Sequence, residues 1–165
     1  RRPDAVALTG VERAVKHEFQ PYEQKWVSTV PNVRIDPHPF AEGALRRAYR
    51  LTDLSLPPDE QQFVCKIAKD SRVSTEQYWS DVLMQSEAKL WADRFNARNP
   101  PKKVDFLAAF VLELVERSSK PVCAVERYVH GEYVKYNNNA GWSDERRNTP
   151  HAFSHFTFEE SGHKL

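Results

Sequence analysis

Cysteine, glycine and long apolar runs are scarce or absent in this chain of 165 residues. Its two cysteines, Cys65 and Cys123, are too few for a disulfide framework, and both lie inside apolar stretches. We therefore predict packed free thiols and a reducing, cytoplasmic location. No stretch approaches the roughly 18 consecutive apolar residues of a membrane span, so we expect no membrane partner.

An excess of charge of either sign is also missing. The chain has 24 lysines and arginines against 23 aspartates and glutamates, interspersed throughout, which gives a net charge of +1. A protein that binds nucleic acid by neutralising phosphates gathers its cations on one face. We therefore expect no nucleic-acid partner.

Signatures of the common nucleotide-binding folds cannot be found. The sequence contains neither G-x-G-x-x-G nor a GxxxxGK[ST] phosphate loop. It also lacks the VAIK, HRD and DFG motifs of ordinary protein kinases. These absences argue against a dinucleotide-binding domain, a phosphate-loop NTPase and a conventional protein kinase.

The composition is that of an ordinary globular domain, with 40% hydrophobic and 28% charged residues. The length suits about one domain with a real core. Residues 43–51 and 62–68 read as strands, joined by a Pro-Pro-Asp connection. Residues 104–115 read as a buried strand, although a buried helix is also possible, and 121–129 as its hairpin partner. Prolines interrupt the β-rich stretch 26–40, which suits an edge strand and a loop.

Three segments predict helices. Apolar residues at helical spacing within 11–19 indicate a short amphipathic helix. Residues 74–95 form the clearest helix, because Ser74 and Gln77 fit a capping box. One apolar stripe follows along this helix: Met84, Ala88, Trp91 and Phe95. A third helix begins near Thr149 and ends at Gly162. The predicted class is α+β, a curved antiparallel sheet with one packed helix followed by the beginning of a second layer.

A few charged residues stand in apolar strands. Alternation places Lys66 on the same face as Val64 and Ala68, where its amine either holds an anion such as phosphate or faces solvent. Arg46 and Arg47 point to opposite faces of their strand, so at most one of them serves a ligand on a given face.

Two carboxylates and two histidines also allow either a functional or a purely structural interpretation. Glu113 and Glu126 interrupt the two most apolar strands, and each either forms an ion pair across the hairpin or faces outward. His151 and His155 lie four residues apart, a spacing that can clamp a metal. Two histidines make at most half a metal site, so a helix-surface or packed role is the alternative.

Six stretches carry a more specific pattern: "PFAEGALRRAY" (39–49), "FVCKIA" (63–68), "DVLMQSEAKLWADRFN" (81–96), "VLEL" (111–114), "VERYVHGEYVKYNNNAG" (125–141) and "TPHAFSHFTFEESGHKL" (149–165). Together, and in this order, they resemble the alpha-type protein kinases. This atypical serine/threonine kinase family includes the soluble myosin heavy-chain kinases and elongation-factor-2 kinases. The resemblance covers most of residues 37–165.

The resemblance implies a two-lobed kinase-like fold that binds ATP with magnesium and phosphorylates a serine or threonine of a protein substrate. Residues 1–36 would lead into an N-lobe over 37–129, and 130–165 would begin the C-lobe. The resemblance also implies roles for individual residues at the nucleotide. Lys66 would be the catalytic lysine that contacts the α- and β-phosphates, and Arg46 would lie in the region that covers the phosphates. Glu126 and Tyr128 would contact the adenine, largely through main-chain groups, Gln85 would face Lys66, and His155 would be a ligand of a structural zinc. Relatives usually carry glutamine at the position of His151, so that histidine is not counted as a ligand.

The likeness also implies missing parts. Relatives continue into an aspartate-containing "DIQG"-like run, a second acidic metal-binding motif and the remaining zinc ligands. Phosphoryl transfer needs carboxylates for magnesium and a group that positions the attacking hydroxyl. We therefore expect an ATP-binding portion that is inactive alone, truncated on its C-terminal side. The alternatives are a non-catalytic nucleotide-binding or interaction module derived from such a kinase, and a β-rich domain without a ligand.

Overall fold

The chain falls into two compact units. The computed structural model describes residues 10–70, 72, 74–138 and 140–165. Unit 1 comprises Arg1–Ser86 and Leu107–Tyr128, and unit 2 comprises Glu87–Phe106 and Val129–Leu165. The first nine residues of the predicted lead segment lie outside the described residues. Within the described part of the chain, no helix is both long and apolar enough for a membrane span.

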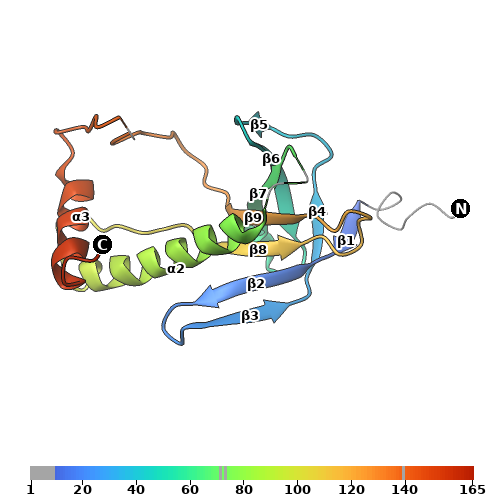
Figure 1. Cartoon of the computed structure of the whole chain (residues 1–165), viewed down its shortest axis with the longest axis horizontal. Helices are drawn as coiled ribbons and strands as arrows, with labels where there is room; N and C mark the ends of the chain where they lie inside the picture. The colour runs from blue at the N-terminus through green and yellow to red at the C-terminus, as the bar shows by residue number, and fades with distance from the viewer. Residues whose placement is uncertain (1–9, 71, 73, 139) are drawn as a thin grey trace, which may run out of the picture. The chain divides into compact units, whose positions relative to one another are not determined.

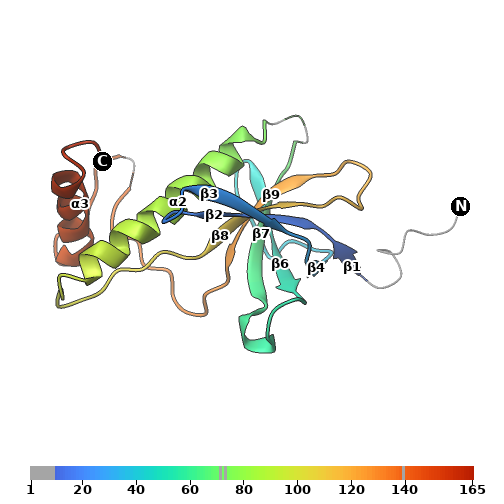
Figure 2. The same cartoon turned by 90° about the horizontal axis from the view of Figure 1, so that it is seen from below.

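A nine-stranded antiparallel sheet dominates unit 1 (Figure 1). Its strands are β1 (Val11–Arg13), β2 (Val15–Gln20), β3 (Lys25–Thr29), β4 (Asn32–Ile35), β5 (Ala41–Glu42), β6 (Arg46–Asp53), β7 (Gln62–Ala68), β8 (Ala109–Glu113) and β9 (Val122–Arg127). The order across the sheet is β1-β4-β6-β7-β9-β8-β2-β3, and β5 pairs with β6. The sheet is curled, so that β2 and β3 run at a steep angle to β6 (Figure 2). A short 3-10 helix, Pro58–Glu60, precedes β7.

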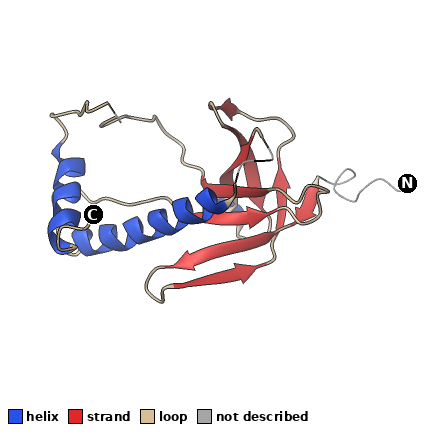
Figure 3. Ribbon diagram, in the orientation of Figure 1, coloured by secondary structure: helices blue, strands red, loops and turns tan. Residues whose placement is uncertain are grey.

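The predicted α+β class and four of the predicted strands are confirmed (Figure 3). Residues 43–51 and 62–68 correspond to β6 and β7, which pair with each other. The stretch 104–115 is a strand rather than a helix, although β8 is shorter than predicted. It forms the expected hairpin with β9, in which Leu112 lies opposite Cys123.

The amphipathic helix predicted within residues 11–19 is wrong, because this segment forms β1 and β2. Its buried residues are Glu12, Ala14 and Lys16, every second position, as in a strand. Two of these three side chains are charged, so the spacing of apolar residues alone did not indicate a strand. Distant partners make their burial possible: Arg117 pairs with Glu12, and the ring of Phe110 lies 4.3 Å from the Lys16 amine.

Each face of the sheet packs against a separate apolar cluster. Phe63 and Cys65 point into the first cluster, with Ile67 packed against it, as the alternation in β7 predicted. The two cysteines are free and buried, as expected, and their sulfur atoms lie 3.0 Å apart. The opposite face packs Ala68 against Tyr78 and other residues of the long helix.

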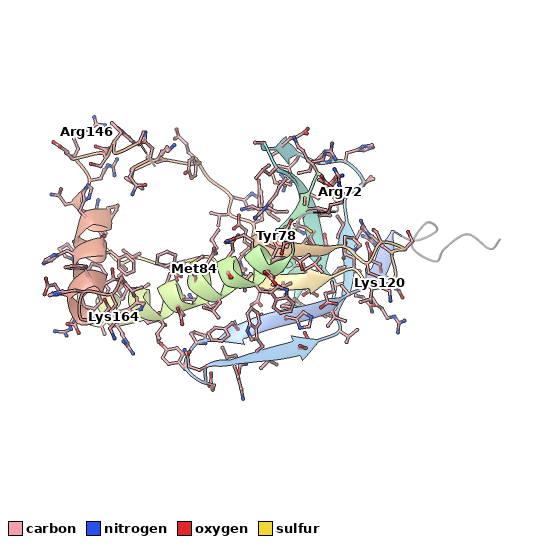
Figure 4. The ribbon with its side chains drawn as sticks, viewed as in Figure 1. Arg72, Tyr78, Met84, Lys120, Arg146 and Lys164 are labelled. Atoms are coloured by element: carbon pink, nitrogen blue, oxygen red, sulfur yellow. The ribbon has the colours of Figure 1, made fainter. Side chains whose placement is uncertain are left out.

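The long helix is α2 (Glu76–Asn96). Tyr78 is only 3% exposed and lies near its start, beside the sheet (Figure 4). The predicted apolar stripe is wrong in part, because Met84 is 56% exposed whereas Val82 is buried. The predicted capping box does not form, although Ser74 still accepts a bond from the first turn of the helix. Ser74 Oγ accepts a hydrogen bond from the Glu76 N–H, but the Gln77 amide donates to Asp81 instead of reaching back.

Unit 2 contains the C-terminal part of α2 and the helix α3 (Asn148–Glu160). The Phe153 ring packs edge-on against Phe95 and tilted against Phe106, with ring centres 5.5 and 5.6 Å apart. Gly162 follows α3 at φ +67°, the left-handed turn that the sequence predicted for its end. The helix begins one residue before Thr149, and no side chain caps it.

Candidate functional site

Strand register gathers the candidate residues on one face of the unit 1 sheet. Lys66 lies opposite Ala48 of β6 and Ala124 of β9. Two rows flank it on the same face. One row pairs Arg46 with Ala68, and the other aligns Arg50, Val64 and Glu126. Along β6, β7 and β9, the cationic side chains of Arg46, Arg50 and Lys66 therefore share one face with the Glu126 carboxylate.

Lys66 forms an ion pair with Glu126. Its Nζ lies 2.5 Å from Glu126 Oε1, and the two side chains are 38% and 27% exposed. The amine is therefore neither buried nor free in solvent but is held at the surface of the sheet. The pair joins β7 to β9 and does not cross the β8–β9 hairpin. Glu113, the other carboxylate in an apolar strand, instead contacts His17 Nε2 on β2 at 2.9 Å.

Arg46 is held against the first turns of α2. Its guanidinium lies 4.6 Å from the centre of the Tyr78 ring, and its Nη2 lies 3.4 Å from Asp81 Oδ2. Arg47 belongs to the other face, as the alternation predicted, and pairs with Glu42 across β5 and β6. Of the two arginines, only Arg46 shares the face of Lys66.

Gln85 bonds to the main chain. Its side-chain amide donates to the carbonyl oxygen of Leu107 at 2.7 Å, just before β8. The resemblance implied a glutamine facing Lys66, and the structure shows no bond between the two. The amide instead fixes α2 to the segment that enters β8.

Tyr128 lies just after the end of β9, where its N–H donates to the carbonyl oxygen of Gln62. Its hydroxyl accepts a hydrogen bond of 3.2 Å from Arg50 Nη2, and the Arg50 guanidinium also lies 4.4 Å from the centre of its ring. Sequence reasoning missed Arg50. The signal was available, because Arg46 and Arg50 are four residues apart on one strand and so point to the same side.

A metal site is not assembled in the described residues. His155 is exposed on α3, as is His151. No group of three or more histidine, cysteine, aspartate or glutamate side chains that could hold a metal occurs among the residues that the structure describes. A structural zinc takes four such ligands, so His155 alone does not fit one.

Comparisons with known proteins agree with the fold and the motifs. Residues 41–165 match the Alpha-kinase family. The chain is 52% identical to Alpha-protein kinase 1 of Dictyostelium discoideum over 99% of its own length and 12% of the relative. It is 48% identical to Myosin heavy chain kinase B of the same organism, over 96% of the chain and 22% of the relative. It is 39% identical to Eukaryotic elongation factor 2 kinase of Homo sapiens, over 93% of the chain and 22% of the relative.

Solved structures give the same result. The alpha-kinase domain of Myosin heavy chain kinase A in complex with ADP superposes with a TM-score of 0.80 at 35% identity, covering 93% of this chain and 74% of that domain. The same domain in complex with AMPPCP gives 0.81 at 34% identity, with the same coverage of both chains. This chain thus spans less than a quarter of the curated relatives named above and about three quarters of the solved domain. The chain belongs to the alpha-kinase family.

Proposed function

We propose that this chain is the ATP-binding portion of an alpha-type serine/threonine protein kinase. In this proposal residues 37–129 form the N-lobe and 130–165 begin the C-lobe. The observation that carries the proposal is the Lys66–Glu126 ion pair on the face that also presents Arg46. Relatives in which this domain was solved with nucleotides support it.

The spacing along β6 suits a nucleotide. Arg46 and Arg50 are four residues apart, which corresponds to about 13 Å along a strand. Lys66 lies between them, opposite Ala48. A nucleotide laid across this face would place its phosphates by Arg46 and Lys66 and its base toward the 126–128 segment.

Charge supports the same orientation. Phosphate oxygens form charge-assisted hydrogen bonds with ammonium and guanidinium groups, and these bonds are about twice as strong as neutral ones. Glu126 holds the Lys66 amine in place before a ligand binds, so less side-chain entropy is lost on binding. The N–H groups of Arg127 and Tyr128 already donate to Ala108 and Gln62, but a main-chain carbonyl oxygen of this segment has two lone pairs and can accept a hydrogen bond from the amino group of adenine.

Magnesium and zinc fit the described residues poorly. Magnesium in kinases bridges phosphate oxygens and is held by carboxylates, and no suitable cluster of side chains occurs in the described part of this chain. We therefore propose that the ligands for magnesium, the residue that positions the substrate hydroxyl and the partners of His155 lie elsewhere in the whole kinase. The protein substrate with its serine or threonine acceptor and the cytoplasmic location belong to the same proposal.

Titration of the 165-residue chain with a fluorescent ADP analogue tests the nucleotide site. We expect saturable binding that unlabelled ADP displaces and that Lys66→Met weakens at least tenfold. Absence of binding by a folded wild-type chain would refute the proposal.

A non-catalytic nucleotide-binding module is the second candidate, favoured because the residues that the structure describes contain no cluster of carboxylates that could hold a metal. A phosphotransfer assay on the whole protein separates the two candidates. Incorporation of phosphate into a protein substrate would support the kinase, and binding of nucleotide without incorporation would support the module.

A further inference from the structure

Arg50 lies at the base end of the proposed nucleotide face, between two aromatic rings. Its guanidinium carbon is 5.3 Å from the centre of the Phe40 ring and 4.4 Å from that of Tyr128. The two rings are themselves perpendicular, with centres 6.4 Å apart. Three segments therefore meet at one cation: the approach to β5, the middle of β6 and the residue after β9.

The contact is directional as well as close. Arg50 Nη2 donates to the Tyr128 hydroxyl at 3.2 Å while the same guanidinium lies over the Tyr128 ring. Among the described residues, no carboxylate lies within ion-pair distance of Arg50, in contrast to Arg46, Arg47 and Lys66. Its positive charge is therefore not neutralised by a neighbour and is directed at the aromatic rings.

A small displacement of Tyr128 would move the main chain that is proposed to contact the base. β9 ends at Arg127, and the Tyr128 N–H still bonds to β7 through the carbonyl oxygen of Gln62. Unit 1 ends at this residue. The bond to Gln62 is the last main-chain bond to β7 at the end of β9, and the contacts of the Tyr128 side chain with Arg50 add to it in fixing the position of the segment. Main-chain readout of a base depends on that position, because hydrogen bonds weaken steeply with poor geometry.

We propose that Arg50 is a positioning residue that holds the 126–128 segment in the place where it distinguishes adenine from other bases. This inference rests on the proposed nucleotide site and adds the source of its base selectivity. Arg50 acts through Tyr128, with Phe40 completing the clamp, and does not itself contact the phosphates.

The test compares the affinities of ADP and GDP for the 165-residue chain. Arg50→Met keeps much of the side-chain bulk but removes the charge and the donor, and Tyr128→Phe keeps the ring but removes the acceptor. We expect the preference for ADP over GDP to fall at least fivefold in Arg50→Met and to fall less in Tyr128→Phe. The matched control is Arg47→Met, the neighbouring arginine on the opposite face, which should leave the preference unchanged.

The ratio of affinities separates positioning from a merely structural role. Partial unfolding lowers the affinities for both nucleotides by one factor and leaves their ratio unchanged. An unchanged ratio in Arg50→Met, or a wild-type chain that binds ADP and GDP equally, would overturn the inference while nucleotide binding stands. A wild-type chain that binds neither would instead refute the proposed function on which the inference rests.

Discussion

The Lys66 amine and the Glu126 carboxylate meet across β7 and β9 at 2.5 Å. Sequence reasoning left open a solvent-facing lysine and a glutamate paired across the β8–β9 hairpin. The structure instead joins these two residues to each other. The arrangement is a preformed cation at the surface of the sheet, held by a carboxylate that a phosphate can compete with.

Replacing Lys66 should weaken nucleotide binding and leave the fold intact. In Lys66→Met we expect the affinity for ADP to fall at least tenfold, because the cation of the phosphate end is lost. The free energy of unfolding should change by at most about 1 kcal/mol, since partly exposed ion pairs contribute little. A fluorescent-nucleotide titration and urea unfolding measure the two quantities. Lys89→Met, which removes an ion pair with Asp105 on unit 2, is the control and should bind ADP normally. Unaltered ADP affinity in Lys66→Met would contradict the assignment.

Breaking the buried pair between Glu12 and Arg117 should destabilise the sheet strongly. The Glu12 side chain is 1% exposed, and the Arg117 guanidinium bonds to both of its oxygens. Arg117→Ala would leave the carboxylate buried and unpaired, which costs about 3 kcal/mol. Urea unfolding of the variant measures this loss. Arg13→Ala removes the exposed pair with Glu116 and should have little effect, so equal losses in both variants would contradict the prediction.

Alkaline pH should destabilise unit 1 through Cys65. The hydrogen bond with Cys123 and burial raise the pKa of the Cys65 thiol well above its usual value. The folded state thus keeps its proton at a pH where the unfolded thiol, with a pKa of about 8.5, loses it. This stabilisation is complete below the unfolded pKa and is lost as pH rises beyond it. The unfolding free energy of the wild type should therefore fall more steeply above about pH 9 than that of Cys65→Ala. Parallel curves would count against the prediction.

Gln85 should matter for the fold more than for the nucleotide. Its amide donates to the carbonyl oxygen of Leu107, so Gln85→Ala should cost about 1 kcal/mol of unfolding free energy. We expect ADP affinity to change less than twofold, since the structure shows no bond from this amide to Lys66. Urea unfolding and nucleotide titration on one preparation check both values. A large loss of ADP affinity with normal stability would restore the role that the family resemblance implied for Gln85.

The local sequence pattern predicted much of the sheet correctly, but it predicted the wrong structure for residues 11–19. In residues 62–68 the period of two assigned Phe63, Cys65 and Ile67 to one face, and β7 points these side chains to that face. Residues 11–19 alternate as well, but with Glu12 and Lys16 at the buried positions. No local rule favours burial of a charge. The partner that makes it possible for Glu12 is Arg117, 105 residues away in sequence.

The sequence by itself determined the class, the family and the faces of the central strands, because alternation, turn residues and motif order are local properties. The tertiary structure alone decided which charges meet. Lys66 and Glu126, Arg50 and Tyr128, and Glu12 and Arg117 become neighbours only when strands distant in sequence pair in one register. That register depends on the packing of the whole sheet, since a slip of one residue would turn every side chain of a strand to the other face.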